Sequence, residues 1–251
     1  FKSWHFFNRK IKMEVKIIPC LNDNYSYLIF DKSNKNACVI DPSESKPVIK
    51  AIEENKVKLK YILNTHHHYD HVGGNKELKE KYDSKIVGFK DDKDRIPEID
   101  ILVEDNQIWK EENFEAKIYH IPGHTAGHIA FHFFKEKKIF TGDTLFSLGC
   151  GRIFEGTYEQ MFNSLNKIKI LPKDTEIYCG HEYTLKNGDF CLANDANNMK
   201  LKKKIEIIKK KLENNLPSIP TILGDEIECN IFLKAKNLDS FSKLRDLKDN
   251  F

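Results

Sequence analysis

Seven consecutive residues, Thr65-His66-His67-His68-Tyr69-Asp70-His71, contain four of the chain's ten histidines and one carboxylate. They follow the apolar run Tyr61-Ile62-Leu63, which is typical of a strand, so a tight loop there can aim several side chains into one cavity. A chance surface loop does not explain the His-x-His-x-Asp-His spacing. Imidazole and carboxylate together suit zinc, iron or manganese, whereas a structural zinc site more often uses pairs of cysteines. The stretch therefore predicts a metal site, with ligands enough for two ions.

The composition predicts a globular protein with a substantial core. The chain has 251 residues, 40% of them hydrophobic, which allows one large domain or a main domain with a smaller appendage. Its 41 Lys and Arg nearly balance 38 Asp and Glu, and the net charge of +3 demands neither nucleic acid nor an anionic membrane. No apolar run approaches the roughly 18 residues of a membrane span. We expect no nucleic-acid or membrane partner, and a monomer is favoured.

The cysteines and the first residues bear on the compartment. The six cysteines are scattered without a Cys-x-x-Cys pair, which indicates a reducing compartment and no disulfide framework. Residues 1–12 are basic and aromatic, contain no acid and precede Met13, so we interpret them as an N-terminal extension. The extension is either additional upstream sequence or the end of an organelle-targeting leader. We expect a cytoplasmic protein, or one of an organelle matrix if the extension is such a leader.

Strand and helix patterns predict a mixed α/β domain over residues 13–181 and a small helical domain over residues 182–251. Short apolar segments separated by turn signals favour antiparallel strands between Val15 and Ile40. After His181 the strand patterns almost vanish, and residues 198–215 have apolar residues at helical spacing among lysines. Other predicted helices cover 47–55, 74–82, 158–168 and 240–248, and one begins at Thr221. Further predicted strands cover 59–63, 85–89, 107–110, 114–120, 129–134, 138–141 and 176–179.

Three later segments place a metal-capable residue beside glycine directly after a predicted strand. Glycine allows the backbone torsions that bring a ligand into a crowded centre. Each segment alone is ordinary turn material, but together with the histidine stretch they favour one shared centre. The segments are Ile121-Pro122-Gly123-His124-Thr125-Ala126-Gly127-His128, Phe140-Thr141-Gly142-Asp143-Thr144 and Tyr178-Cys179-Gly180-His181-Glu182-Tyr183.

The order and spacing of these segments resemble the metallo-β-lactamase superfamily. The resemblance implies an α/β fold, the αββα sandwich, with a dinuclear centre along one edge of its sheets. It also implies two divalent metal ions as cofactors, zinc in the first place, with iron or manganese as alternatives. By the family pattern, one ion is held by His66, His68 and His124, the other by Asp70, His71 and His181, and Asp143 bridges both.

The same pattern leaves the remaining histidines outside the ligand set. His67 and His128 are then not ligands, and His128 orients or packs behind the site. We interpret His5, His120 and His132 as ordinary structural or surface histidines.

Within this superfamily, motifs outside the metal site resemble those of the glyoxalase II (hydroxyacylglutathione hydrolase) family. The resemblance covers the chain from Met13 to Phe251. This implies hydrolysis of S-(2-hydroxyacyl)glutathione thioesters, S-D-lactoylglutathione to D-lactate and glutathione, which is the second step of methylglyoxal detoxification. Asp70 and Asp143 would be the catalytic residues. The matching motifs are Asp23-Asn24-Tyr25-x-Tyr27-Leu28, Gly149-Cys150-Gly151-Arg152-x-Phe154-Glu155-Gly156-Thr157, Cys179-Gly180-His181-Glu182-Tyr183-Thr184 and Arg245-x-x-Lys248-Asp249-x-Phe251.

The resemblance further implies that the helical domain helps to bind glutathione, through Arg152, Tyr183, Arg245 and Lys248. The chemistry agrees, because glutathione has two carboxylates that call for cationic donors. Arg152 stands where the animal pattern has lysine, and Phe154 where it has tyrosine, so one substrate hydrogen bond is in doubt. The plain alternative for Arg245 and Lys248 is a solvated helix end.

Other functions fit parts of the pattern. A mononuclear iron sulfur dioxygenase acting on glutathione persulfide shares much of the histidine pattern, but the Arg245-x-x-Lys248 segment favours the hydrolase. A nucleic-acid-processing hydrolase of the superfamily is disfavoured by the small net charge. A non-catalytic binding protein that keeps the fold is expected to have lost ligands, whereas all seven positions are occupied here.

Overall fold

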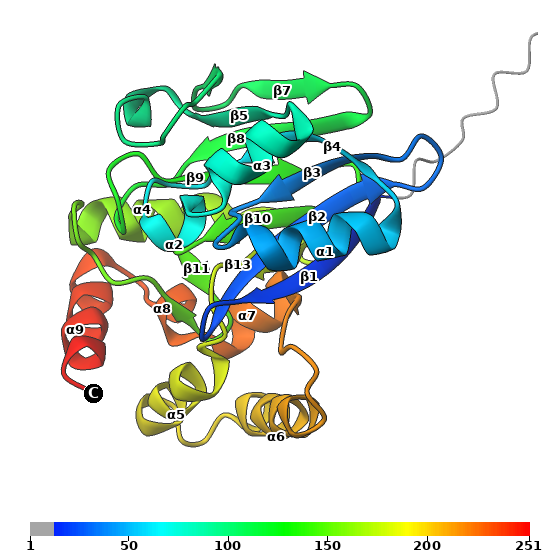
Figure 1. The fold of residues 1–251 in the computed structure, drawn as a ribbon. Coiled ribbons are helices and arrows are strands. Elements are labelled where there is room, and N and C mark those ends of the chain that lie inside the picture. Colours follow the sequence, from blue (N-terminus) through cyan, green and yellow to red (C-terminus); the bar gives the residue numbers. More distant parts are fainter. Residues whose placement is uncertain (1–12) are drawn as a thin grey trace, which may run out of the picture.

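Two six-stranded sheets face each other, and helices cover their outer faces (Figure 1). This computed structural model describes residues 13–251, so the expected extension at residues 1–12 lies outside the described residues. The main core lies between the sheets. Two further clusters of buried apolar residues lie outside them, one between each sheet and the helices on its side. The expected αββα sandwich is confirmed.

The first sheet is antiparallel at one side and parallel at the other, with strand order β1-β2-β3-β4-β5-β6. Its strands are β1 (Met13–Cys20), β2 (Asn24–Asp31), β3 (Asn36–Ile40), β4 (Lys58–Leu63), β5 (Lys85–Phe89) and β6 (Ile101–Val103). The second sheet has the order β14-β13-β10-β9-β8-β7. Its strands are β7 (Ile108–Glu111), β8 (Phe114–His120), β9 (Ile129–Phe133), β10 (Lys138–Gly142), β13 (Glu176–Cys179) and β14 (Thr221–Ile222), and a separate hairpin pairs β11 (Leu145–Phe146) with β12 (Gly149–Cys150).

Strand β2 shows why the sandwich forms. All eight of its residues are buried. Side chains alternate along a strand, so Tyr27 and Ile29 face the core between the sheets, while Leu28 and Phe30 face the helical side. Because both faces are covered, the strand is apolar over most of its length.

The helices of the N-terminal half pack on the outer face of the first sheet, and the later helices lie on the side of the second sheet. Those of the first sheet are α1 (Ser45–Asn55), α2 (Tyr69–Val72) and α3 (Asn75–Tyr82), with the short 3-10 helix η1 (Lys90–Asp92) following β5. The remaining helices are α4 (Tyr158–Lys169), α5 (Thr184–Asn194), α6 (Met199–Glu213), α7 (Leu223–Cys229), α8 (Ile231–Lys234) and α9 (Leu238–Asp249). Helix α4 packs on the second sheet, whereas α5 and α6 lie at the lower end of the molecule in Figure 1, beyond the hairpin β11–β12. Helix α6 buries Leu201, Ile205 and Ile208, as its sequence pattern predicts.

The C-terminal part is mainly helical but also adds a strand to the sandwich. Strand β14 pairs with β13, so the helix predicted from Thr221 was placed too early and begins at Leu223. Helix α5 and strand β6 were not predicted. Asn187 and Gly188 interrupt the apolar pattern of α5, and the three residues of β6 are too few to show a period.

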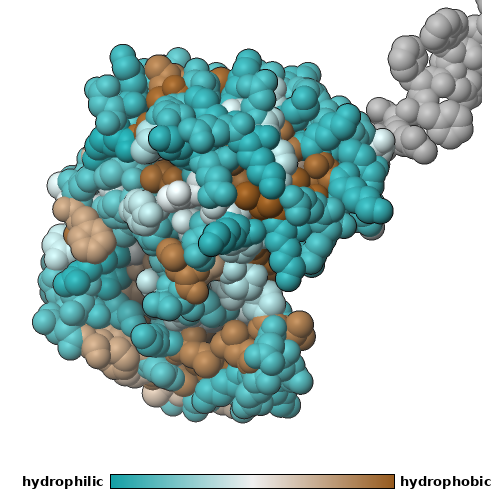
Figure 2. Space-filling model, in the orientation of Figure 1, coloured by the Kyte–Doolittle hydropathy of each residue, from teal (hydrophilic) through white to brown (hydrophobic). Residues whose placement is uncertain are grey.

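The surface and the cysteines agree with a compact globular protein. The face in Figure 2 is mainly hydrophilic, with apolar patches near the lower end, where Figure 1 places α5 and α6. Among residues 13–251 no helix combines the length and the apolar character needed to cross a membrane. All six cysteines are buried free thiols.

A buried carboxylate on α7 joins the C-terminal part to the hairpin β11–β12. Glu226 is fully buried and accepts hydrogen bonds from the backbone N–H of Leu148 (2.8 Å) and from Nζ of Lys204 (2.6 Å). Asn230, at the end of α7, donates hydrogen bonds to the carboxylate of Glu226 and to the backbone oxygen of Gly149. A buried charge is stable only when paired in this way, so the network fixes the hairpin against α7.

Replacing Glu226 with alanine would leave the partly buried Lys204 ammonium without its carboxylate partner and the backbone N–H of Leu148 without its acceptor. We expect Glu226→Ala to lower the free energy of unfolding by about 3–5 kcal/mol, measured by urea denaturation. The matched control is Glu228→Ala on the same helix, because Glu228 pairs with Lys200 at the exposed surface and its loss should leave stability unchanged. Equal effects of the two substitutions would contradict the role assigned to Glu226.

Candidate metal centre

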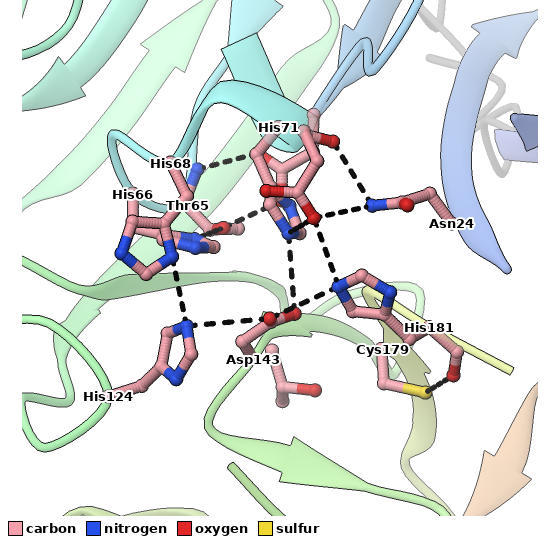
Figure 3. Close-up of polar contacts among 12 residues, drawn as sticks. Asn24, Thr65, His66, His68, His71, His124, Asp143, Cys179 and His181 are labelled. Atoms are coloured by element: carbon pink, nitrogen blue, oxygen red, sulfur yellow. Dashed lines mark hydrogen bonds and ion pairs between the residues drawn. The ribbon is translucent and has the colours of Figure 1, made fainter. Parts of the chain in front are cut away.

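Four segments meet at one edge of the sandwich, each at the end of a strand (Figure 3). The loop after β4 leads into α2, the second segment joins β8 to β9, and the others follow β10 and β13. Together they bring to one place all seven side chains expected as metal ligands. These are His66, His68, Asp70 and His71 from the first segment, His124 from the second, Asp143 from the third and His181 from the last.

Two glycines allow the segments to come this close. Gly142 ends β10 with φ +47°, a left-handed conformation that disfavours other residues, and it turns the chain so that Asp143 faces the centre. A Cβ atom at Gly142 would overlap Oγ1 of Thr65. A Cβ atom at Gly180 would overlap Oδ1 of Asp143. Gly142 therefore requires glycine for both backbone shape and packing, whereas Gly180 requires it for packing.

The first group of ligands consists of three imidazoles, His66, His68 and His124. One ring nitrogen of each lies within 4.8 Å of the others. Nε2 of His124 is 3.1 Å from Nδ1 of His68. Nε2 of His66 is buried and makes no hydrogen bond to the described residues.

The second group consists of Asp70, His71 and His181, whose ligand atoms also lie within 4.8 Å of one another. Oδ2 of Asp70 is 3.6 Å from Nε2 of His71 and 3.4 Å from Nε2 of His181. His71 and His181 are buried, whereas the side chain of Asp70 is 37% exposed and is the most accessible of the three.

Asp143 lies between the two groups, as Figure 3 shows. Its Oδ2 is 3.5 Å from Nε2 of His124 and 3.2 Å from Nε2 of His181. Its Oδ1 is 3.4 Å from Nε2 of His71. One carboxylate thus faces imidazoles of both groups, which is the arrangement that a bridging ligand requires.

Four of the imidazoles are oriented through their other ring nitrogen. Nδ1 of His66 contacts Oγ1 of Thr65 (3.0 Å), and Nδ1 of His124 donates to the backbone oxygen of Arg152 (2.8 Å). Such contacts hold the ring and direct the free nitrogen to a metal. The corresponding contacts of the second group are Nδ1 of His71 to Asp41 (3.0 Å) and Nδ1 of His181 to Asp23 (2.8 Å).

Asp23, Asn24 and Asp41 were not recognised as site residues from the sequence. Asp41 also forms a group of potential ligands with His66 and His71. However, its carboxylate already accepts hydrogen bonds from the backbone N–H and from Oγ1 of Thr65. We therefore assign it a supporting role. Its position one residue after β3, beside the end of β4, is the signal that could have identified it.

Electrostatics differ between the two groups. Burial lowers the pKa values of His66, His68 and His124, so these imidazoles are neutral. For His71 burial acts in the same direction, but Asp143 and Asp41 outweigh it and raise the pKa to about 10. Burial also acts to lower the pKa of His181, but Asp143, Asp70 and Asp23 outweigh it and raise that pKa to about 11.

The carboxylates of the centre stay ionised. Burial acts to raise the pKa of Asp143, but His71 and His181 outweigh it and hold that pKa well below its usual range. The pKa of Asp70 is also lowered, because its contacts with His181, His71 and Asn24 outweigh burial. Both side chains are therefore available as anionic ligands at neutral pH.

The other histidines lie outside the ligand groups. His128 stacks on His66 at 4.6 Å between ring centroids, and its Nε2 accepts a hydrogen bond from the backbone N–H of Asp143 (3.0 Å). His67 lies between Asp92 and Glu155, 3.5 Å from each. His120 donates to the backbone oxygen of Ala126, and the pKa of His132 is lowered to about 4 by burial and by Lys117. His5 lies outside the described residues.

Two aromatic rings border the centre. Tyr183 stacks on His181, with ring centroids 4.7 Å apart and planes inclined by 6°. Phe154 is 61% exposed, and its ring lies 5.1 Å from that of His124 and 6.0 Å from that of His68. These rings form apolar walls beside the two groups of ligands.

The expected glutathione contacts from α9 occupy different environments. Arg245 is 4% exposed, so the solvated-helix alternative is wrong for this residue. Its Nη1 donates to the backbone oxygen of Cys150 (3.0 Å) and its Nη2 to Asp249 (2.8 Å). Asp249 also lies 3.7 Å from Nε of the exposed Arg152. The half-buried Lys248 places its Nζ over the ring of Phe190.

Comparison with known proteins supports two linked family assignments. Residues 22–181 match the model of the metallo-β-lactamase superfamily, and residues 182–251 match the model of the hydroxyacylglutathione hydrolase C-terminus. A hydroxyacylglutathione hydrolase of Pelagibacter ubique (strain HTCC1062) is 68% identical over 239 residues, which cover 95% of this chain and all of that protein. One of Rhodopseudomonas palustris (strain HaA2) is 41% identical and covers 94% of this chain and 98% of that protein.

Solved structures show the same fold at lower identity. The BLEG-1 B3 metallo-β-lactamase superposes with a TM-score of 0.69 at 21% identity, covering 88% of this chain and 99% of that one. ETHE1 from Myxococcus xanthus superposes with a TM-score of 0.71 at 21% identity, covering 93% and 90%. Because the two family models together match residues 22–251 and these relatives cover 94–95% of the chain, the chain belongs to the metallo-β-lactamase superfamily and, within it, to the hydroxyacylglutathione hydrolase (glyoxalase II) family.

Proposed function

We propose that this protein hydrolyses S-(2-hydroxyacyl)glutathione thioesters, converting S-D-lactoylglutathione to D-lactate and glutathione in the second step of methylglyoxal detoxification. The observation that carries the proposal is the joining of the metal centre to a C-terminal part that matches the hydroxyacylglutathione hydrolase C-terminus. The sulfur dioxygenase alternative is not favoured, because the relatives described above, which cover 94–95% of the chain, are hydroxyacylglutathione hydrolases.

The donor set fits two divalent ions. Nε2 of His66, Nε2 of His71 and Oδ1 of Asp143 are buried and make no hydrogen bond to the described residues, although buried polar atoms are normally paired. Ions would supply the missing partners. His66, His68 and His124 would hold one and Asp70, His71 and His181 the other, with Asp143 between them. Nitrogen and oxygen ligands of this kind suit zinc first, and also iron or manganese.

The chemistry of thioester hydrolysis matches this arrangement. Two ions held by these residues would supply Lewis-acid chemistry, which lowers the pKa of a bound water toward neutral pH and polarises an acyl oxygen. The side chain of Asp70 is partly exposed and accepts a hydrogen bond from Nδ2 of Asn24 (2.9 Å), so it can orient the attacking water through a hydrogen bond. A thiol with a pKa of about 8.5 leaves readily as the thiolate, so the site needs no strong general acid.

Substrate recognition is assigned to the side of the centre formed by α9 and the segment around Arg152. Arg152 is exposed and projects beside Phe154, with 5.9 Å from its guanidinium carbon to the ring centroid. Arg245 and Lys248 approach from α9. Cationic side chains here can pair with the two carboxylates of glutathione, while Tyr183 and Phe154 flank its thioester. Phe154 lacks the hydroxyl of the tyrosine usual in the animal pattern, so it contributes packing alone.

Ligand substitutions test the centre directly. We expect Asp143→Asn and His66→Ala each to lower kcat for S-D-lactoylglutathione by about two orders of magnitude or more, because each removes a ligand of the ions. Thiol release measures turnover, and circular dichroism checks the fold. His120→Gln is the control and should keep full activity, since His120 lies outside the ligand groups. Full activity of Asp143→Asn would refute the assignment.

The raised pKa values of two ligands predict proton release on metal binding. Without an ion, His71 and His181 carry protons at pH 7, since their pKa values are raised to about 10 and about 11. An ion requires neutral nitrogen, so binding should release roughly two protons per chain, and affinity should fall as pH falls from 8 to 6. Calorimetry in buffers of different ionisation enthalpy counts these protons. Binding without proton release would contradict the prediction.

Substitution of the cationic side chains should act mainly on substrate binding. We expect Arg152→Ala and Lys248→Ala to raise KM roughly tenfold with little change in kcat, because they bind ground and transition states alike. Arg245→Ala should raise KM and also lower the melting temperature, since the guanidinium is buried against Cys150. Lys243→Ala, on an exposed turn of α9, is the control. An unchanged KM in all three variants would place the glutathione site elsewhere.

A further inference from the structure

The two groups of ligands are supported by different kinds of residue. In the first group, the direct partners of His66 and His124 are neutral, namely the hydroxyl of Thr65 and a backbone oxygen, and Asp41 is linked to His66 only through the Thr65 hydroxyl. In the second group, carboxylates stand behind both imidazoles, Asp41 behind His71 and Asp23 behind His181. A carboxylate that accepts the Nδ1 proton makes the imidazole a more basic ligand. The second position is therefore the more anionic one.

One short turn, between β1 and β2, contacts the second group at two ligands. Oδ1 of Asp23 is 2.8 Å from Nδ1 of His181. The amide of Asn24 donates to Oδ2 of Asp70 (2.9 Å) and to its backbone oxygen (3.1 Å). Figure 3 shows Asn24 reaching the centre from this side. No hydrogen bond or ion pair of the described residues joins Asp23 or Asn24 to His66, His68 or His124.

The turn does not need the carboxylate of Asp23 to hold its place. The backbone N–H of Tyr25 donates to the backbone oxygen of Gly180 (2.8 Å). The backbone N–H of Glu182 donates to the backbone oxygen of Asp23 (2.8 Å). Asn24 and His181 also form an isolated β-bridge. These backbone contacts fix the turn beside His181, so the Asp23 side chain, 43% exposed, is free to serve the ligand.

We propose that Asp23 and Asn24 are positioning residues that set the metal affinity of the second position selectively, so that the two positions of the centre fill and empty separately. Asp23 acts by placing negative charge behind His181, and Asn24 by holding Asp70 in its ligand orientation. This inference rests on the proposed two-ion centre. It distinguishes two positions that share Asp143 and that would otherwise be expected to lose their ions together.

The test compares metal retention in full-length variants. Zinc-loaded protein is equilibrated against buffers of decreasing free zinc, and bound zinc per chain is measured by atomic emission. We expect Asp23→Asn, which keeps an acceptor but removes the charge, to weaken the second position about 10- to 100-fold and to leave the first unchanged. Asn22→Ala is the matched control in the same turn, because Asn22 is exposed. It should behave as wild type.

Two further backgrounds identify which position is affected. In His181→Ala, which keeps the complete ligand set of the first position, adding Asp23→Asn should not change the affinity of the remaining ion. In His66→Ala, which keeps the second ligand set, adding Asp23→Asn should lower the affinity for the remaining zinc ion. Asn24→Ala provides an independent variant and should show the same selectivity, with melting temperatures of the zinc-free proteins as a check on folding.

The outcomes separate this inference from the proposed function. If wild type binds two ions and Asp23→Asn weakens both positions equally, or neither, the inference is wrong while the two-ion centre stands. If wild type never binds more than one ion, the two-ion proposal fails before any variant is compared, and the inference fails with it.

Discussion

The carboxylate of Asp143 is buried between imidazoles of two separate groups, and much of the structure serves to make that position stable. An ionised carboxylate is costly to bury unless it is paired. Here it lies within 3.5 Å of His124, His71 and His181, which come from three different segments. The segments can meet because their strands end at one edge of the sandwich, and because Gly142 and Gly180 leave room for a close approach.

The supporting residues extend this constraint outward. Each oriented imidazole has one nitrogen occupied by a neighbour and the other directed inward, so the ligand geometry exists before an ion binds. Such preorganisation limits the cost of assembling a centre from separate loops. The C-terminal part is held to the same framework through the buried Glu226, which keeps the hairpin β11–β12, and with it the segment leading to Arg152, beside the centre.

Much of the fold and most of the centre could be predicted from the sequence, for physical reasons. His66, His68, Asp70 and His71 lie in one short stretch, and His124, Asp143 and His181 stand beside glycines after apolar runs, so these local patterns, together with the family resemblance, indicated which residues would meet. Asp23 and Asn24 belong to a matching motif and Asp41 follows a strand, but their partners are many residues away, so nothing in the local sequence shows that they contact the predicted ligands. The burial of Arg245 was also missed, because a basic residue near a chain end has the pattern of a solvated helix while its contact, Cys150, lies 95 residues away.

The most direct test of the account is to titrate the ion-free protein with zinc and to measure bound ions and hydrolysis of S-D-lactoylglutathione on the same samples. The account predicts that hydrolysis is negligible without ions, follows the number bound, and reaches its maximum when both positions around Asp143 are filled. Full hydrolysis by protein shown to contain no bound metal would contradict it.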